Sequence, residues 1–197
     1  MKLILVRHGE TDSNVQEIVQ GQLPVPLNSR GFEQAKKVGL RLKTEKIDVI
    51  YSSDLKRAKQ TAAEIARFHK IPLIYSVLLR ERKFGRLEGM PSEEYKKLRA
   101  SSGIPRHLYR PPGGESYSDV SKRVRGFLSM IKKRHENENV LLVSHGGVLR
   151  IFVALLTKKP LKEVFDIEAH KNTAVSVIEL RRGSPPKIHY LNSTEHL

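Results

Sequence analysis

Two segments of the sequence place a histidine directly after a short apolar run. Residues 5–9 are Leu-Val-Arg-His-Gly, and residues 142–146 are Leu-Val-Ser-His-Gly. A neutral imidazole such as that of His8 can attack phosphorus, and a second imidazole, His145, can donate to a phosphoryl oxygen. The guanidinium of Arg7 offers forked donors that match phosphate oxygens. If folding brings the two segments together, these residue types predict phosphoryl-transfer chemistry.

Arg57 and Glu81 are candidates to complete such a site. Arg57 falls in the first turn of a predicted helix, where backbone N–H groups also attract anions. Positioning and electrostatics dominate phosphoryl transfer, so two guanidiniums and two imidazoles could support it without a metal. The two histidines also lack the spacing of a zinc site, and we predict no metal. Taken alone, Arg57 could be a solvated side chain, and Glu81 could pair with its basic neighbours.

Length and composition indicate one globular unit. With 197 residues the chain can bury one core, and we expect a single domain over residues 1–197. A hydrophobic share of 39% excludes a disordered chain. The absence of cysteine excludes disulfides, thiolate catalysis and cysteine-ligated zinc. No apolar stretch could span a bilayer and no signal-peptide pattern is present, so we expect a cytoplasmic protein without a membrane partner.

The formal net charge of +15 has two interpretations. A basic patch could bind nucleic acid or a membrane, or the charge could focus a multiply anionic small substrate toward a cationic cleft. The cations are spread over several segments, among them Lys36-Lys37, Lys96-Lys97, Lys132-Lys133-Arg134 and Lys158-Lys159. No nucleic-acid motif accompanies them, so we favour a small-molecule phosphate ester over nucleic acid as the partner. The pattern gives no indication of an oligomeric state.

Hydrophobic periodicity predicts strands that alternate with helices. The predicted strands are 3–6, 47–51, 73–75, 140–143, 174–180 and 188–191, and the predicted helices are 29–42 with Ser29 as N-cap, 55–68, 92–99, 116–135 and 148–156. This order is typical of a three-layer α/β/α sandwich with a mostly parallel central sheet. Ligands bind such sheets at the carboxyl ends of the strands. The pattern weakens at about 82–115, where we expect an inserted flap.

The residues 5–11, Leu-Val-Arg-His-Gly-Glu-Thr, resemble the signature of the histidine phosphatase superfamily, which includes the cofactor-dependent phosphoglycerate mutases. Further similar segments are Asn14, Gln20-Gly21, Ser52–Thr61, Ser144–Gly147 and the loop Leu79–Gly85, which resembles the family's acid-bearing loop. The resemblance covers most of the chain. It implies the phosphoglycerate mutase-like fold and a reaction that needs no metal.

The resemblance also implies roles for individual residues. His8 would be the phosphorylated nucleophile and Glu81 the proton donor, which afterwards deprotonates the attacking water. The phosphate pocket would be formed by Arg7, Arg57 and His145 and completed by Asn14 and Gly146, and the expected substrate contacts are Gln20, Gly21 and Arg82. Because His8 must be neutral on its attacking nitrogen, its other nitrogen should donate to a backbone carbonyl. We expect the other six histidines at surface or packing positions, with His107 in the flap.

Among the reactions of this family, the sequence favours hydrolysis. The mutases have a longer, arginine-bearing insertion after the loop that corresponds to Leu79–Gly85, whereas here Gly89 is followed by Met90-Pro91-Ser92. The segments Leu79–Gly85 and Pro111–Glu115 resemble the branch that contains fructose-2,6-bisphosphatases and broad-specificity phosphatases, and the basic flap suggests a multiply anionic ester. One alternative is a 2,3-bisphosphoglycerate-dependent phosphoglycerate mutase. Another is a non-catalytic module that binds phosphate or nucleic acid.

Overall fold

The computed structural model describes all residues from 1 to 197 and contains one six-stranded sheet in the order β3-β2-β4-β1-β5-β6. The strands are β1 (Lys2–Arg7), β2 (Val49–Ser53), β3 (Leu73–Ser76), β4 (Asn139–Ser144), β5 (Val175–Glu179) and β6 (Lys187–Ser193). Neighbouring strands from β3 to β1 are parallel, whereas β5 and β6 are antiparallel to their neighbours. The prediction of a mostly parallel sheet is confirmed.

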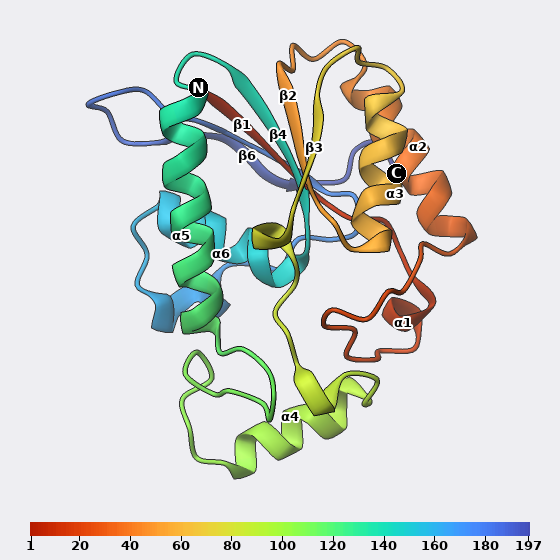
Figure 1. Cartoon of the computed structure of the whole chain (residues 1–197), viewed down its shortest axis with the longest axis vertical. Coiled ribbons are helices and arrows are strands. Elements are labelled where there is room, and N and C mark those ends of the chain that lie inside the picture. The colour runs from red at the N-terminus through yellow and green to blue at the C-terminus, as the bar shows by residue number, and fades with distance from the viewer.

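Helices cover both faces of this sheet (Figure 1). The α-helices are α1 (Asp12–Val15), α2 (Ser29–Leu42), α3 (Lys56–Ala66), α4 (Ser92–Ser101), α5 (Tyr117–Arg134) and α6 (Gly146–Leu156), and short 3-10 turns are η1 (Val77–Leu79), η2 (Gly85–Leu87) and η3 (Leu161–Asp166). None of the helices combines the length and the apolar character needed to cross a bilayer.

Side chains of β1 alternate between the two faces and so form two cores. Leu3 and Leu5 pack in one cluster with apolar residues of α5 and α6, and Ile4 and Val6 pack in the other with residues of α2 and α3. Each face is buried because strand side chains point alternately to opposite sides. The prediction of three layers, α/β/α, is confirmed.

Several helix ends differ from the sequence prediction: α3 ends at Ala66 rather than 68, α4 ends at Ser101 rather than 99, and the starts of α2 and α6 differ for physical reasons. The N-cap of α2 is Asn28, not Ser29, since the Asn28 side chain accepts from the Gly31 N–H and also donates to Glu10. Helix α6 begins at Gly146, two residues before the predicted start. Because glycine is a weak helix former, the sequence predicts a helix that starts only after Gly146 and Gly147.

Residues 82–115, for which we keep the name flap, lie beyond the carboxyl ends of the parallel strands (Figure 1). They contain η2 and α4, near the predicted helix 92–99. Backbone hydrogen bonds join the flap to the loop after α1, from Val19 N to Met90 O at 2.9 Å and from Ser92 N to Glu17 O at 2.8 Å. The division into a single domain with an inserted flap stays a prediction.

The loop after β1 packs backbone against backbone on the first turn of α2. A Cβ atom on Gly31 would lie 2.0 Å from the carbonyl oxygen of Glu10, and one on Gly9 would lie 2.5 Å from the carbonyl oxygen of Gly31. Gln34 holds the same loop from α2, accepting from Glu10 N at 2.9 Å. Because Gly9 directly follows His8, this packing of the loop on α2 fixes the backbone next to His8.

We predict that Gly31→Ala lowers the free energy of unfolding by about 1–3 kcal/mol, because the added methyl group overpacks a contact between two backbones. Gly126→Ala is the matched control, since a Cβ atom there meets nothing within 4 Å on α5. That change should raise the free energy of unfolding by about 0.5–1 kcal/mol. Urea denaturation of both variants is the measurement, and equal effects of the two would contradict the prediction.

Candidate active site

A pocket opens at the carboxyl ends of β1 and β2 and extends under the flap. Its lining residues are Arg7, His8, Asn14, Val19, Gln20, Gly21, Arg57, Glu81, Arg82, Phe84, Ser92, Tyr95, Lys96, Arg106 and Tyr117. Of the site residues predicted from the sequence, only His145 and Gly146 are missing from this lining, and both lie directly behind it. The fold therefore brings residues from distant parts of the chain to one place.

The pairing of β1 with β4 brings the two histidines together. The strands are parallel neighbours with Arg7 opposite Ser144, so His8 and His145 leave the sheet side by side. The backbone N–H of His8 donates to the carbonyl of Ser144 at 3.0 Å, and the two imidazole centroids are 5.1 Å apart. The prediction that these two strand ends meet at one edge of the sheet is confirmed.

His8 is buried and held in one orientation. Its Nδ1 lies 2.7 Å from the carbonyl oxygen of Gly9, which can only accept, so Nδ1 carries the hydrogen. Burial lowers the pKa of His8 well below its usual value, and the charges of Arg57 and Arg7 act in the same direction, against the Gly9 hydrogen bond. His8 is therefore neutral at pH 7 with its lone pair on Nε2, 3.3 Å from the Arg57 Nε that donates to it.

His145 is also buried and neutral. Burial lowers its pKa well below the usual value, and Arg57 adds to this effect. Its Nε2 lies 2.8 Å from Ser53 Oγ, whereas Nδ1 has no hydrogen-bond partner. One buried ring nitrogen of His145 is thus unsatisfied in the protein alone, which is typical of a site that awaits a polar ligand.

Next to His8 the positive charge of the pocket comes from the buried Arg57 and the partly buried Arg7. Arg7 Nη1 donates to the carbonyl of His170 at 2.7 Å, and its Nε has no partner. Arg57 donates to the carbonyls of Leu23 at 3.1 Å and Gly21 at 2.8 Å. Burial lowers the pKa of Arg57 to about 10, with Arg7 adding to this effect. Neither guanidinium forms an ion pair with a carboxylate, so both remain available to an anion.

Glu81 faces the first turn of α6. Its Oε1 accepts from Arg82 N at 2.8 Å, and its Oε2 accepts from Gly147 N at 3.1 Å. A Cβ atom on Gly147 would lie 2.6 Å from Glu81 Oε1, so a side chain there would displace the carboxylate. This approach explains why two glycines begin α6 despite their low helix propensity.

The remaining predicted residues differ in what their side chains do. Asn14 caps α1 and accepts from Asn172 Nδ2 at 3.3 Å, and Gln20 has a buried amide oxygen without a partner. Arg82 is 1% exposed, with its guanidinium 4.0 Å from the ring centroid of Phe84, so it borders the pocket mainly as a packed side chain. Gly146 lies beside Arg7, and a Cβ atom there would make only an ordinary van der Waals contact at 3.7 Å from Arg7 Nε.

Several residues of the site were not predicted. Asn172 Nδ2 donates to the carbonyl of His8 at 3.0 Å but lies in no recognisable motif, and Ser53, which contacts His145, lies in the family-like segment Ser52–Thr61 but was given no role. Arg106 lines the pocket, whereas its neighbour His107 does not. The only sequence signal for Arg106 was the basic character of the flap. No group of three or more side chains among His, Cys, Asp and Glu could hold a metal ion.

Comparisons with known proteins show the family of this chain. The sequence model of the histidine phosphatase superfamily (branch 1) matches residues 3–194. Phosphoserine phosphatase 1 of Hydrogenobacter thermophilus is 37% identical, over 100% of this chain and 94% of that protein. A broad-specificity phosphatase of Saccharomyces cerevisiae is 34% identical, over 100% and 87% of the two chains. The solved structure of Bacillus stearothermophilus YhfR has a TM-score of 0.90 at 32% identity and covers 99% of this chain and 98% of its own.

The buried histidines predict a loss of stability in mild acid. Burial lowers the pKa of His170 from 6.5 to about 4 and also lowers the pKa values of His8 and His145 well below 6.5. Below pH 6.5 the unfolded chain binds protons that the folded protein does not, so the free energy of unfolding falls as pH falls. Each such histidine contributes a slope of about 1.4 kcal/mol per pH unit between its two pKa values.

His170→Gln tests this slope, because glutamine can still contact Ser176 but does not titrate. We expect its plot of unfolding free energy against pH to be shallower than that of the wild type between pH 6.5 and 4 by about 1.4 kcal/mol per pH unit. Urea titrations at several pH values measure it. Parallel plots for the two proteins would show that protonation of His170 does not contribute to the pH dependence of stability.

Proposed function

Because the chain belongs to the histidine phosphatase superfamily and is a phosphatase, we propose that it hydrolyses small anionic phosphomonoesters through a phosphohistidine on Nε2 of His8. The observation that carries this proposal is the hydrogen bond from His8 Nδ1 to the Gly9 carbonyl. It leaves a lone pair on Nε2 inside a pocket whose guanidiniums have no carboxylate partner. A neutral nucleophile in a cationic pocket is what transfer from a phosphate dianion requires.

In the proposed first step, His8 Nε2 attacks phosphorus from the side opposite the ester oxygen. The P–N bond forms as the P–O bond breaks, and the leaving oxygen takes a proton from Glu81. Arg57, which donates to Nε2 when the pocket is free, would turn its donors to the phosphoryl oxygens.

In the proposed second step, water attacks the phosphohistidine. Glu81, now a carboxylate, takes a proton from the water, the P–N bond breaks, and its electron pair returns to His8 Nε2. The products are the alcohol and inorganic phosphate, and the proton that Glu81 takes from water restores the protonated carboxyl with which the cycle began. All the groups in this cycle belong to the chain itself.

His145 is proposed to donate to a phosphoryl oxygen. Ser53 Oγ accepts from Leu55 N at 3.3 Å, so its own hydrogen can go to His145 Nε2. The imidazole hydrogen then lies on Nδ1, the buried nitrogen without a partner. Together with Arg7 Nε, another buried donor without a partner, His145 supports the assignment of this part of the pocket to the phosphoryl group.

A second anionic group of the substrate is proposed to bind near the flap. Arg106 lines the pocket, and its guanidinium makes no hydrogen bond or ion pair but lies 3.8 Å from the ring centroid of Phe165. Partial burial lowers the pKa of Arg106, and the charges of Arg150 and Arg99 add to this effect. Arg7, Arg57 and Arg106, which form no ion pair with a carboxylate, fit a sugar bisphosphate or a phosphorylated carboxylic acid. Phosphoserine, after which the Hydrogenobacter thermophilus relative is named, carries such a carboxylate.

The central test measures phosphate release from a panel of esters in the presence of a chelator. His8→Ala should lower the activity at least about a thousandfold, because the nucleophile is removed. His189→Ala is the matched control, since His189 lies on β6 beside Glu179 and outside the pocket, and it should retain wild-type activity.

The same assay separates the alternatives. Acid-labile phosphate should be trapped on the quenched wild type and absent from His8→Ala. Full activity of His8→Ala would refute the phosphohistidine mechanism. Interconversion of 3-phosphoglycerate and 2-phosphoglycerate in the presence of 2,3-bisphosphoglycerate would favour the mutase instead.

Arg106→Ala tests the second anionic group. We expect kcat/KM for phosphoserine or 3-phosphoglycerate to fall by about tenfold, the value of one charge-assisted contact, while kcat/KM for p-nitrophenyl phosphate stays within about twofold. Arg110→Ala is the control, because Arg110 is also in the flap but pairs with Asp119. An equal loss on both esters would argue against a contact with the second anion.

A further inference from the structure

Glu81 lies on a stretch of chain without helix or strand, between η1 and η2. We call residues 78–83 the acid loop. The carboxylate of Glu81 is held by two backbone N–H groups, but an irregular loop needs other contacts to fix its backbone. The carbonyl oxygen of Glu81 accepts two such contacts, from Gln22 Nε2 at 3.0 Å and from Arg123 Nη2 at 3.2 Å.

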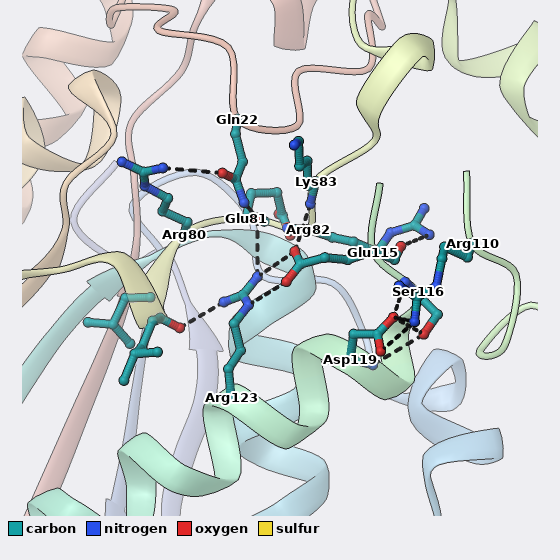
Figure 2. Close-up of polar contacts among 12 residues, drawn as sticks. Gln22, Arg80, Glu81, Arg82, Lys83, Arg110, Glu115, Ser116, Asp119 and Arg123 are labelled. Carbon is teal, nitrogen blue, oxygen red and sulfur yellow. Dashed lines mark hydrogen bonds and ion pairs between the residues drawn. The ribbon is translucent and has the colours of Figure 1, made fainter. Parts of the chain in front are cut away.

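The guanidinium of Arg123 spans the acid loop from α5 (Figure 2). Its Nη1 donates to the carbonyl of Leu78 at 2.7 Å, and its Nη2 donates to the carbonyl of Glu81. One side chain therefore ties both ends of the segment from residue 78 to residue 81. The part of α5 that carries Arg123 is rigid, because Val120 and Val124 of the same helix are fully buried in the core.

Glu115 fixes the guanidinium of Arg123 in turn. The pair is forked, with 2.9 Å from Nε to Oε1 and 3.1 Å from Nη2 to Oε2 (Figure 2), and the two side chains are only 15% and 23% exposed. Glu115 also binds the acid loop directly, since Lys83 N donates to Glu115 Oε2 at 2.9 Å and Glu115 N donates to the carbonyl of Lys83 at 2.8 Å. The start and the end of the flap are thus joined where Glu81 lies.

We propose that Arg123 and Glu115 form a clamp that positions Glu81 for proton transfer. The inference rests on the proposed role of Glu81 as acid and base. Arg123 does not line the pocket and is a positioning residue. Its removal takes away the Arg123 donors to the carbonyls of Leu78 and Glu81 and to the Glu115 carboxylate, and leaves only Gln22 on the Glu81 carbonyl, so the loop gains freedom. Proton transfer requires hydrogen-bond distance, and a misplacement of about 1 Å can cost on the order of a hundredfold in rate.

The test compares two esters that differ in their need for an acid. An alkyl phosphate has a poor leaving group that requires the proton from Glu81, whereas p-nitrophenolate leaves without one. We expect Arg123→Met to lower kcat/KM for the alkyl ester at least about tenfold more than for p-nitrophenyl phosphate. Arg123→Lys should recover part of the loss, since an ammonium can still donate to a carbonyl. Arg125→Met, an exposed neighbour on α5 without hydrogen bonds, should match the wild type.

Glu81→Gln serves as the reference that separates the two proposals. If Glu81→Gln discriminates between the esters and Arg123→Met does not, or if Arg123→Met lowers both equally, the clamp is refuted and the proposed function stands. If Glu81→Gln itself does not discriminate, its role as acid fails and the clamp fails with it. Should Arg123→Met not fold, Glu115→Gln, which removes the charge of the fork, is measured in the same way and by the same criteria.

Discussion

Positive charge that no carboxylate neutralises is the constraint on which this site depends. Arg57 is buried and Arg7 is partly buried, and the protein offers them backbone carbonyls, among them those of Gly21 and His170. Carbonyl dipoles orient a guanidinium without cancelling its charge. Burial, with the charges of Arg57 and Arg7 acting in the same direction, lowers the pKa of His8 and keeps it neutral, and the same charges make an anion the natural occupant of the pocket. Burying charge costs free energy, which the apolar cores on both faces of the sheet must offset.

Much of the fold and the phosphate end of the site could be predicted, because the signals are local. Apolar periodicity located the strands, and the repeated Leu-Val-X-His-Gly pattern predicted that His8 and His145 would meet. What could not be predicted depends on contacts between distant segments. Asn172 binds the carbonyl of a residue 164 positions away, and Ser53 contacts an imidazole 92 positions away. Asn28 rather than Ser29 caps α2 because Glu10, a residue of another loop, accepts a hydrogen bond from the side-chain amide of Asn28.

The site divides between regular and irregular parts of the structure. Arg7, His8 and His145 follow directly from paired strands, so the sheet fixes the groups that face the phosphoryl group. Glu81 and Arg106 lie in segments without strand structure, where side-chain contacts have to replace a hydrogen-bonded ladder. This division suits an enzyme that performs one reaction on many esters. The phosphoryl group, which all esters share, would face the rigid strand ends, and the remainder, which differs among esters, would face the loops.

The joined ends of the flap also bear on how such enzymes diverge. Arg86 N donates to the carbonyl of Pro112 at 3.1 Å, just inside the contact between Lys83 and Glu115, so the chain between them is a loop closed at its base. Doubling the length of a flexible loop costs only about 0.6 kcal/mol in closure entropy. Evolution can therefore lengthen, shorten or rewrite the tip, and with it the range of esters admitted, while descendants inherit the geometry at the base unchanged.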